Sequence, residues 1–284
     1  MTFLAGSLAT RADSAEVRSI GELEPTFARL EAESGGRLGI AILDTGTGRR
    51  AGYRSNERFP MCSTFKVLAC AAVLARVDAG RESLNRRVHF GASDLLSYAP
   101  VTRERAGDGG MAMGELCAAA MTLSDNTAAN LILASLGGPP AVTRIARLLG
   151  DRMTRLDRIE GGLNEATPGD PRDTTSPHAM ASNLRALATG NFLSKPSRDQ
   201  LVTWLVACRT GNEKLRAGVP AAWRIGDKTG SGGHGTTNDV AVIWPPGRAP
   251  VIVCAYLTET AASLEKANAT FVNLGRALQT ALAL

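Results

Sequence analysis

The sequence has few histidines, few aromatic residues and no long hydrophobic run. Its 284 residues include three histidines, and aromatic residues make up only 5%. None of the five cysteines forms a Cys-x-x-Cys pair, and the histidines lie far apart, so the sequence predicts no metal site and no cofactor. No apolar run approaches the 18 residues of a membrane-spanning helix, so no membrane span is predicted.

What is present is ordinary for a globular protein. Hydrophobic residues make up 44% and charged residues 21%, which excludes a disordered chain and a coiled coil. The net charge of +5 is spread along the chain, so no nucleic-acid partner is predicted, and a small anionic ligand fits the charge equally well. Residues 1–19 begin with an apolar segment that lacks basic residues, and both a truncated signal peptide and a flexible leader remain open.

The hydrophobic pattern predicts an α+β fold. Strand patterns occur at 38–44 and 49–53 near one end of the chain, and at 223–229, 239–244 and 250–257 near the other. Helical patterns occupy 21–33, 63–79, 112–123, 126–136, 141–149, 177–189, 196–207 and 261–282. We therefore expect an antiparallel sheet covered by terminal helices, with a helical domain inserted into it. The expected division is an α/β domain from 20–55 and 208–284, and an all-helical domain over 56–207.

A Ser-x-x-Lys motif begins the helix predicted over 63–79. Ser63 lies at the helix N-terminus, where free backbone N–H groups favour developing negative charge. Lys66 lies on the same helical face, and a desolvated lysine can take the proton of a hydroxyl group. Alone the motif is weak, since roughly one such match is expected by chance in a chain of this length. A serine N-cap followed by an exposed lysine is then the commoner explanation.

Two further motifs change that balance. Ser124-Asp125-Asn126 lies between two predicted helices, and Lys228-Thr229-Gly230 ends a predicted strand. Each tripeptide is expected about 0.05 times by chance in a chain of this length. All three motifs, in this order, form the signature of class A β-lactamases and penicillin-binding proteins.

The sequence resembles the class A serine β-lactamases from about residue 20 to its end. The fourth motif of that family, Glu-x-x-Leu-Asn, matches Glu160 to Asn164 inside a predicted surface loop over 157–177. The family fold, a helical domain inserted into an antiparallel α/β domain, agrees with the layout above. The resemblance implies a metal-free, monomeric, periplasmic or secreted enzyme that hydrolyses the β-lactam ring of penicillins and cephalosporins, and so confers antibiotic resistance.

The resemblance also implies a role for each matched residue. Ser63 would attack the lactam carbonyl, with its own backbone N–H and that of Ser231 as the oxyanion hole. Ser124 would pass a proton to the leaving nitrogen, and either Lys66 or Glu160 would be the base for acylation. Glu160 would activate the water that cleaves the acyl-enzyme. The residues expected to contact the substrate are Tyr98, Asn126, Asn164, Lys214, Lys228, Thr229 and Ser231.

Glu160 also distinguishes a β-lactamase from two alternative functions. A DD-peptidase shares the first three motifs and stops at a long-lived acyl-enzyme, and a β-lactam sensor is acylated only once. Neither needs a base for deacylation. The residue after Glu160 is Gly161, where the family commonly has proline, so the resemblance leaves slower deacylation of some substrates open.

Three further matches concern structure and charge. Arg158 and Asp173 match an ion pair that closes the family's loop, and Cys70 and Cys117 match a disulfide known in the family. Lys214 occupies a place where other members supply a positive charge, although a solvated surface lysine is an equally good explanation.

Overall fold

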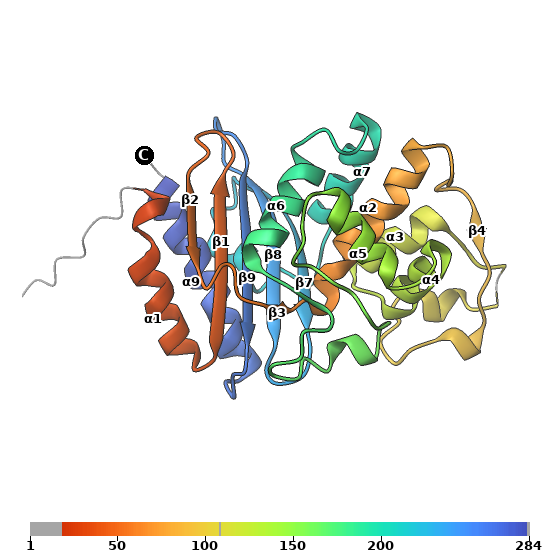
Figure 1. Ribbon diagram of the computed structural model, residues 1–284, viewed down its shortest axis with the longest axis horizontal. Helices are drawn as coiled ribbons and strands as arrows, with labels where there is room; N and C mark the ends of the chain where they lie inside the picture. Colours follow the sequence, from red (N-terminus) through yellow and green to blue (C-terminus); the bar gives the residue numbers. More distant parts are fainter. Residues whose placement is uncertain (1–18, 108, 283–284) are drawn as a thin grey trace, which may run out of the picture.

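The computed structural model describes residues 19–107 and 109–282, and its centre is a five-stranded antiparallel sheet (Figure 1). The strand order is β2-β1-β9-β8-β7, so strands from both ends of the chain lie side by side. The strands are β1 (Arg37–Asp44), β2 (Arg50–Tyr53), β7 (Arg224–Ser231), β8 (Thr237–Trp244) and β9 (Val251–Thr258). The predicted α+β fold is confirmed. The leader or signal peptide predicted within residues 1–19 lies almost wholly outside the described residues.

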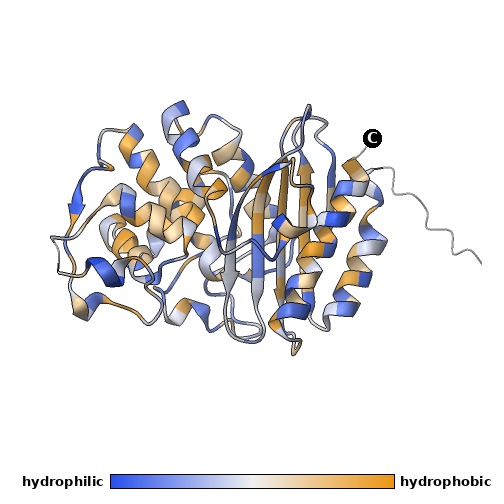
Figure 2. Ribbon diagram, turned by 180° about the vertical axis from the view of Figure 1, so that it is seen from behind, coloured by the Kyte–Doolittle hydropathy of each residue, from blue (hydrophilic) through white to orange (hydrophobic). Residues whose placement is uncertain are grey.

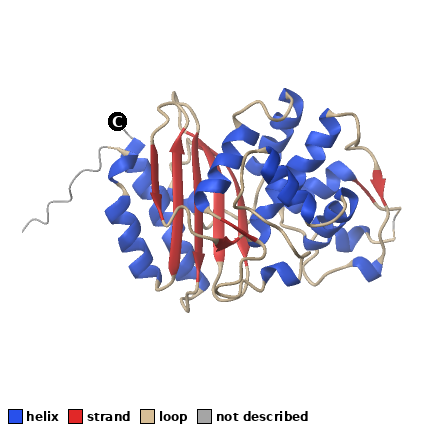
Figure 3. Ribbon diagram, viewed as in Figure 1, coloured by secondary structure: helices blue, strands red, loops and turns tan. Residues whose placement is uncertain are grey.

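Helices cover both faces of this sheet (Figure 3). The first face packs against α1 (Glu24–Ser34) and α9 (Leu264–Leu282). Because successive side chains of a strand point to opposite faces, Ile40 and Ile42 of β1 join Phe271 of α9 in one hydrophobic cluster, whereas Ala41 and Leu43 join the other. β9 is buried along its whole length, which is why its sequence is continuously apolar.

The second face packs against a large helical layer. In Figure 2 the hydrophobic residues gather on the sheet and on the inward faces of the helices. The helices of this layer are α2 (Phe65–Asp78), α3 (Met113–Thr122), α4 (Asn126–Leu136), α5 (Pro140–Leu148), α6 (Pro177–Ala188) and α7 (Lys195–Val206). Within the described residues, no helix is long and apolar enough to cross a bilayer.

Helix α2 is the centre of the helical layer. Every residue from Phe65 to Leu74 is buried, because other helices surround it on all sides. A helix that is hydrophobic all round is typical of a core position. Lys66 is the one charged residue in this buried stretch, so the fold removes its ammonium group from water.

Several short elements were not predicted, because two to four residues carry no periodicity. They are α8 (Leu215–Gly218), the paired strands β3 (Phe59–Pro60) and β6 (Thr174–Thr175), the paired strands β4 (Arg87–Val88) and β5 (Met111–Ala112), and 3-10 turns that include η1 (Ile20–Glu22), η3 (Ala92–Asp94) and η4 (Thr102–Arg105). The β3–β6 pair matters for the site, because it joins the segment before Ser63 to the end of the loop over 157–177.

The predicted disulfide between Cys70 and Cys117 is wrong. All five cysteines are free thiols in the structure. Cys70 lies on α2 and Cys117 on α3, and the Cys70 thiol approaches the backbone carbonyl of Cys117 at 3.9 Å. The hydrogen bond with Cys70, followed by burial, raises the pKa of the Cys117 thiol, so the thiol form is favoured. Both side chains therefore fill space between two helices as small apolar groups.

We expect all five thiols to react with iodoacetamide once the protein is unfolded without reductant. Intact-mass measurement before and after reduction checks this, because free thiols give the same number of additions in both samples. Two further additions that appear only after reduction would show that a disulfide forms in the purified protein.

Candidate active site

Ser63 lies in a 3-10 turn, η2 (Cys62–Thr64), that leads directly into α2. The segment before it is held to the sheet by hydrogen bonds. Asn238 on β8 donates through Nδ2 to the carbonyl oxygens of Pro60 and Met61, at 2.9 and 3.1 Å. Cys62 has a φ of 44°, a left-handed conformation that is strained for a residue other than glycine and is typical of functional sites.

Lys66 contacts several of the polar groups around Ser63. Its Nζ lies 2.7 Å from Glu160 Oε1, and it donates to Asn126 Oδ1 at 2.7 Å and to the carbonyl oxygen of Ser124 at 2.8 Å. Burial lowers the pKa of the Lys66 ammonium group, and the adjacent Glu160 carboxylate opposes that shift. Desolvation and the charge of Glu160 therefore shift the pKa of Lys66 in opposite directions. This suits a group that donates and accepts a proton during the reaction.

Ser124 lies between two lysines at the junction of α3 and α4. Its Oγ accepts hydrogen bonds from Lys66 Nζ at 3.3 Å and from Lys228 Nζ at 3.0 Å. Desolvation, followed by the like charge of Lys66, lowers the pKa of Lys228 to about 8. The next residue, Asp125, caps α4 by accepting from Ala128 N.

Glu160 is held in place at both its backbone and its carboxylate. Its Oε1 accepts from Ser63 Oγ at 3.2 Å, and its Oε2 accepts from Asn164 Nδ2 at 2.6 Å. Asn130 on α4 fixes the backbone, because its Oδ1 accepts from Glu160 N at 2.8 Å. Gly161 has a φ of 102°, which suits glycine, and the chain continues into η5 (Gly162–Asn164). The carboxylate is thus well placed although proline is absent.

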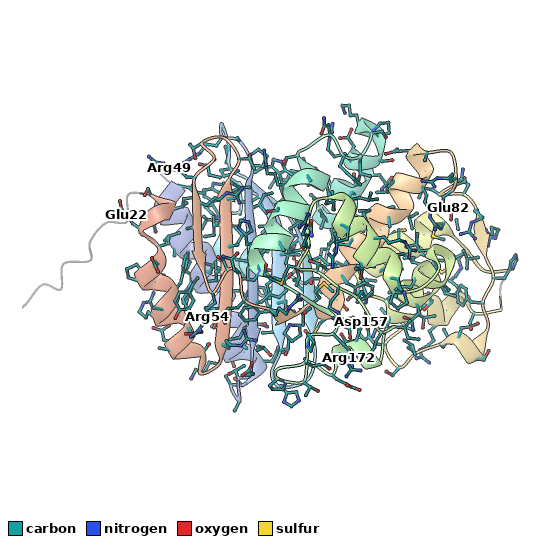
Figure 4. All side chains as sticks on the ribbon, viewed as in Figure 1. Glu22, Arg49, Arg54, Glu82, Asp157 and Arg172 are labelled. Atoms are coloured by element: carbon teal, nitrogen blue, oxygen red, sulfur yellow. The ribbon has the colours of Figure 1, made fainter. Side chains whose placement is uncertain are left out.

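The loop over 157–177 is closed by ion pairs and backbone contacts. Arg158 Nε lies 2.6 Å from Asp173 Oδ2, while Asp173 Oδ1 accepts from the backbone N–H groups of Asp157 and Arg158. Asp157 and Arg172, labelled in Figure 4, belong to opposite ends of this loop. Glu165, inside the loop, lies 2.5 Å from Arg158 Nη1. Closure brings the two ends together and leaves Glu160 at the inner side.

Lys214 is buried rather than solvated. Its Nζ donates to Thr237 Oγ1 at 2.6 Å and to Asn238 O at 3.0 Å, and it lies 5.2 Å from the centre of the Phe271 ring. Among the residues that the structure describes, no carboxylate lies within 4 Å of this ammonium group, whose pKa desolvation lowers. The buried carboxylates of Asp239 and Asp227 act on this ammonium group from farther away and oppose that shift.

Most of the predicted site residues border one open cleft of about 380 Å³, whereas Lys66, Glu160 and Lys228 lie buried behind its lining. Tyr98 is half exposed at its rim and donates through its hydroxyl to Leu123 O. The cleft is lined by Ser63, Tyr98, Ser124, Asn126, Asn164, Thr210, Glu213, Lys214, Thr229, Gly230, Ser231, Leu264 and Asn268. In the described part of the chain, no cluster of His, Cys, Asp and Glu side chains could hold a metal ion.

The comparison with known proteins decides the family. The family model described as "Beta-lactamase enzyme family" matches residues 22–282. The chain belongs to the β-lactamase enzyme family. It is 49% identical to β-lactamase AST-1 of Nocardia asteroides over 91% of this chain and 83% of the relative, and 51% identical to β-lactamase CTX-M-8 of Citrobacter amalonaticus over 84% and 81%.

Solved structures of class A β-lactamases share the fold of this β-lactamase. An ancestral class A β-lactamase (GNCA) superposes with a TM-score of 0.91 at 61% identity, covering 92% of this chain and all of the other. A structure described as the putative class A β-lactamase PenP of Rhodopseudomonas palustris gives 0.90 at 58% identity, covering 92% and 99%. The enzyme is therefore a class A serine β-lactamase.

Sequence reasoning missed the residues that position the others in this β-lactamase. Asn130 follows Asn126 by one helical turn, so the shared helical face was a usable signal. Asn238 and Thr210 gave none, because their contacts depend on strand pairing and on the chain beyond α7. His234 lies at the β7–β8 turn and is not among the residues that line the cleft.

Proposed function

We propose that this β-lactamase hydrolyses penicillins and cephalosporins through an acyl-enzyme on Ser63. The observation that supports it is the sharing of one carboxylate oxygen. Glu160 Oε1 contacts both Ser63 Oγ and Lys66 Nζ, while Asn164 holds the other oxygen. A nucleophile within hydrogen-bond reach of its base, with the base held by a third group, is the arrangement that activates a serine.

Acylation needs a proton acceptor, an oxyanion site and a proton donor. The Ser63 hydroxyl loses its proton to Lys66 or Glu160 as its oxygen attacks the lactam carbonyl. The backbone N–H groups of Ser63 and Ser231 stabilise the oxyanion, where one donor is worth roughly 2.7–4 kcal/mol. Ser124 Oγ then gives a proton to the lactam nitrogen as the C–N bond breaks, and is reprotonated from the lysines beside it.

Deacylation uses Glu160 as a general base. A water molecule between Glu160 and the ester carbon loses a proton to the carboxylate as it attacks, and Asn164 orients that carboxylate. The ester C–O bond breaks and Ser63 Oγ regains a proton. General-base catalysis of this kind contributes roughly 10²–10⁴-fold.

Substrate recognition rests on charge. The substrate carboxylate lies against Lys228, Thr229, Ser231 and Lys214, and the two buried ammonium groups supply the positive charge that binds it. The Asn126 side chain binds the acylamino group of the substrate, and Tyr98 flanks it.

The remaining properties follow the family. The enzyme acts as a monomer in the periplasm or as a secreted protein, without metal, cofactor or nucleic-acid partner. The chain divides into an α/β domain from both chain ends and the helical domain over 56–207, with the cleft between them.

Benzylpenicillin in about hundredfold excess over the protein tests the function. Loss of all the lactam absorbance, with little adduct by intact mass, is the expected result. Loss of one equivalent with a persistent adduct would instead identify a transpeptidase or a sensor. Neither lactam loss nor adduct would leave a β-lactamase fold without the activity.

The pH dependence of KM tests the carboxylate site. With a pKa of about 8, Lys228 keeps its charge below that pH, and only roughly a tenth of it is charged at pH 9. We expect KM for benzylpenicillin to rise about tenfold between pH 7 and pH 9. The methyl ester of benzylpenicillin is the control, because it has no carboxylate. The same rise with the ester would show that the charge of Lys228 does not bind the carboxylate.

A further inference from the structure

The active-site cleft adjoins a second cavity, because the two share three lining residues. Glu213, Leu264 and Asn268 line the cleft, and the same three residues line a larger hollow of about 690 Å³. A ligand in the cleft therefore has room to extend past this shared wall.

The second cavity lies between the segment around α8 and one face of α9. Leu264, Asn268 and Val272 are four residues apart, so they form one line along the helix. The opposite wall includes Glu213 and Ala217. A Cβ built on Gly275 would lie 2.9 Å from Gly218 Cα, so the two backbones touch beside the cavity and fix the spacing of its walls.

The near part of this cavity is acidic. Glu213 is exposed, and no cationic side chain of a described residue pairs with it or with Glu265. Asn268 is 8% exposed; its Nδ2 donates to Glu213 Oε2 at 3.4 Å, and its Oδ1 has no hydrogen-bond partner. Arg276 is the cationic residue that lines this cavity, but it lies eight residues after Asn268, about 12 Å along the helix.

The chemistry of the substrate fits this arrangement. In a cephalosporin the C3 substituent stands on the ring atom next to the one that bears the carboxylate, whereas a penicillin has only methyl groups nearby. When the carboxylate lies at Lys214 and Ser231, the C3 substituent points toward the wall formed by Glu213 and Asn268. The substrate carboxylate adds a negative charge beside Lys214, on which the Asp239 and Asp227 carboxylates already act, so Lys214 does not cancel the charge of Glu213 at this wall.

We infer that the second cavity is the subsite for the C3 substituent of cephalosporins, and that Glu213 makes it favour a cationic substituent. The inference rests on the proposed hydrolysis of β-lactams and specifies its substrate class. Glu213 acts here by binding and takes no part in bond cleavage.

Two cephalosporins with the same acylamino side chain test this. Cephaloridine carries a cationic pyridinium group on the C3 methylene, and cephalothin carries a neutral acetoxy group. The ratio of their kcat/KM values should fall about three- to tenfold in Glu213→Gln, since one nearby charge is worth about this much at a protein surface. In the parent enzyme, 0.5 M salt should reduce the same ratio, because exposed charges are screened.

Two further variants complete the design. Glu24→Gln on α1 removes an exposed carboxylate far along the chain and should leave the ratio unchanged. Ala217→Phe narrows the cavity and should lower kcat/KM for both cephalosporins relative to benzylpenicillin. Hydrolysis of both drugs with the same ratio in Glu213→Gln would overturn the inference and leave the hydrolase. No hydrolysis of any of the three drugs by the parent would overturn the proposed function instead.

Discussion

The Glu160→Gln variant should stop at the acyl-enzyme. Glutamine has nearly the same shape and still offers an oxygen to Asn164 Nδ2, but its amide cannot take a proton from water. Ser63 is still acylated if Lys66 can act as the base, so one equivalent of benzylpenicillin is consumed quickly. Steady-state kcat should then fall roughly 10²–10⁴-fold. Intact-mass spectra of samples quenched over time should show an adduct that persists after the burst.

Glu165→Gln is the matched control for this variant. Its carboxylate lies in the same loop, is more than half exposed and pairs with Arg158. This variant should accumulate no adduct. Turnover by Glu160→Gln at the parent rate would show that another group activates the water. Absence of a burst would instead identify Glu160 as the base for acylation as well.

Substitution of Lys66 with methionine should affect both catalysis and stability. Methionine has a similar length and no charge, so it leaves the Glu160 carboxylate buried without its closest cation. Removal of one partner of a buried ion pair costs roughly 3–5 kcal/mol of unfolding free energy. The acylation rate should also fall by about 10²–10⁴-fold, because Lys66 is in contact with the groups that transfer the proton. Single-turnover kinetics and denaturant unfolding measure the two effects.

The double variant Lys66→Met/Glu160→Gln separates these effects. It removes both charges, so no uncompensated ion remains buried and most of the lost stability should return. Its acylation rate should stay low. If the double variant is as unstable as Lys66→Met alone, the loss comes from packing on α2 and not from the unpaired carboxylate.

The regular elements were predictable because each carries a periodic pattern. The continuous apolar runs in β1 and β9 indicated a sheet made from both chain ends. The ends of the strands facing the cleft were less predictable. β7 extends to Ser231 and β8 begins at Thr237, because these two residues pair across the turn. These strand ends were not predicted, because glycine and serine have a low propensity for strands.

The motifs indicated which residues form the site, but not which side chains contact one another within it. No sequence pattern indicated that Lys66 contacts Ser124, Asn126 and Glu160 simultaneously. The sequence also left Lys214 undecided between a surface and a site position, because burial of one lysine depends on strand β8 and helix α9 closing over it. The Cys70–Cys117 disulfide was inferred from family resemblance alone, and the free thiols show the limit of that argument.

The strand order has a consequence for how the chain reaches its native state. The strand at the middle of the sheet, β9, is the last to be synthesised, and it pairs Thr258 with Arg37 at the other end of the chain. Contacts between residues so far apart in the sequence form slowly, because a long loop must close before they can stabilise the folded state. The hairpin of β1 and β2 therefore keeps an unpaired edge until β9 has been synthesised. Truncation before β9 should leave a nascent chain without a completed sheet, and so still open to a chaperone or a translocase.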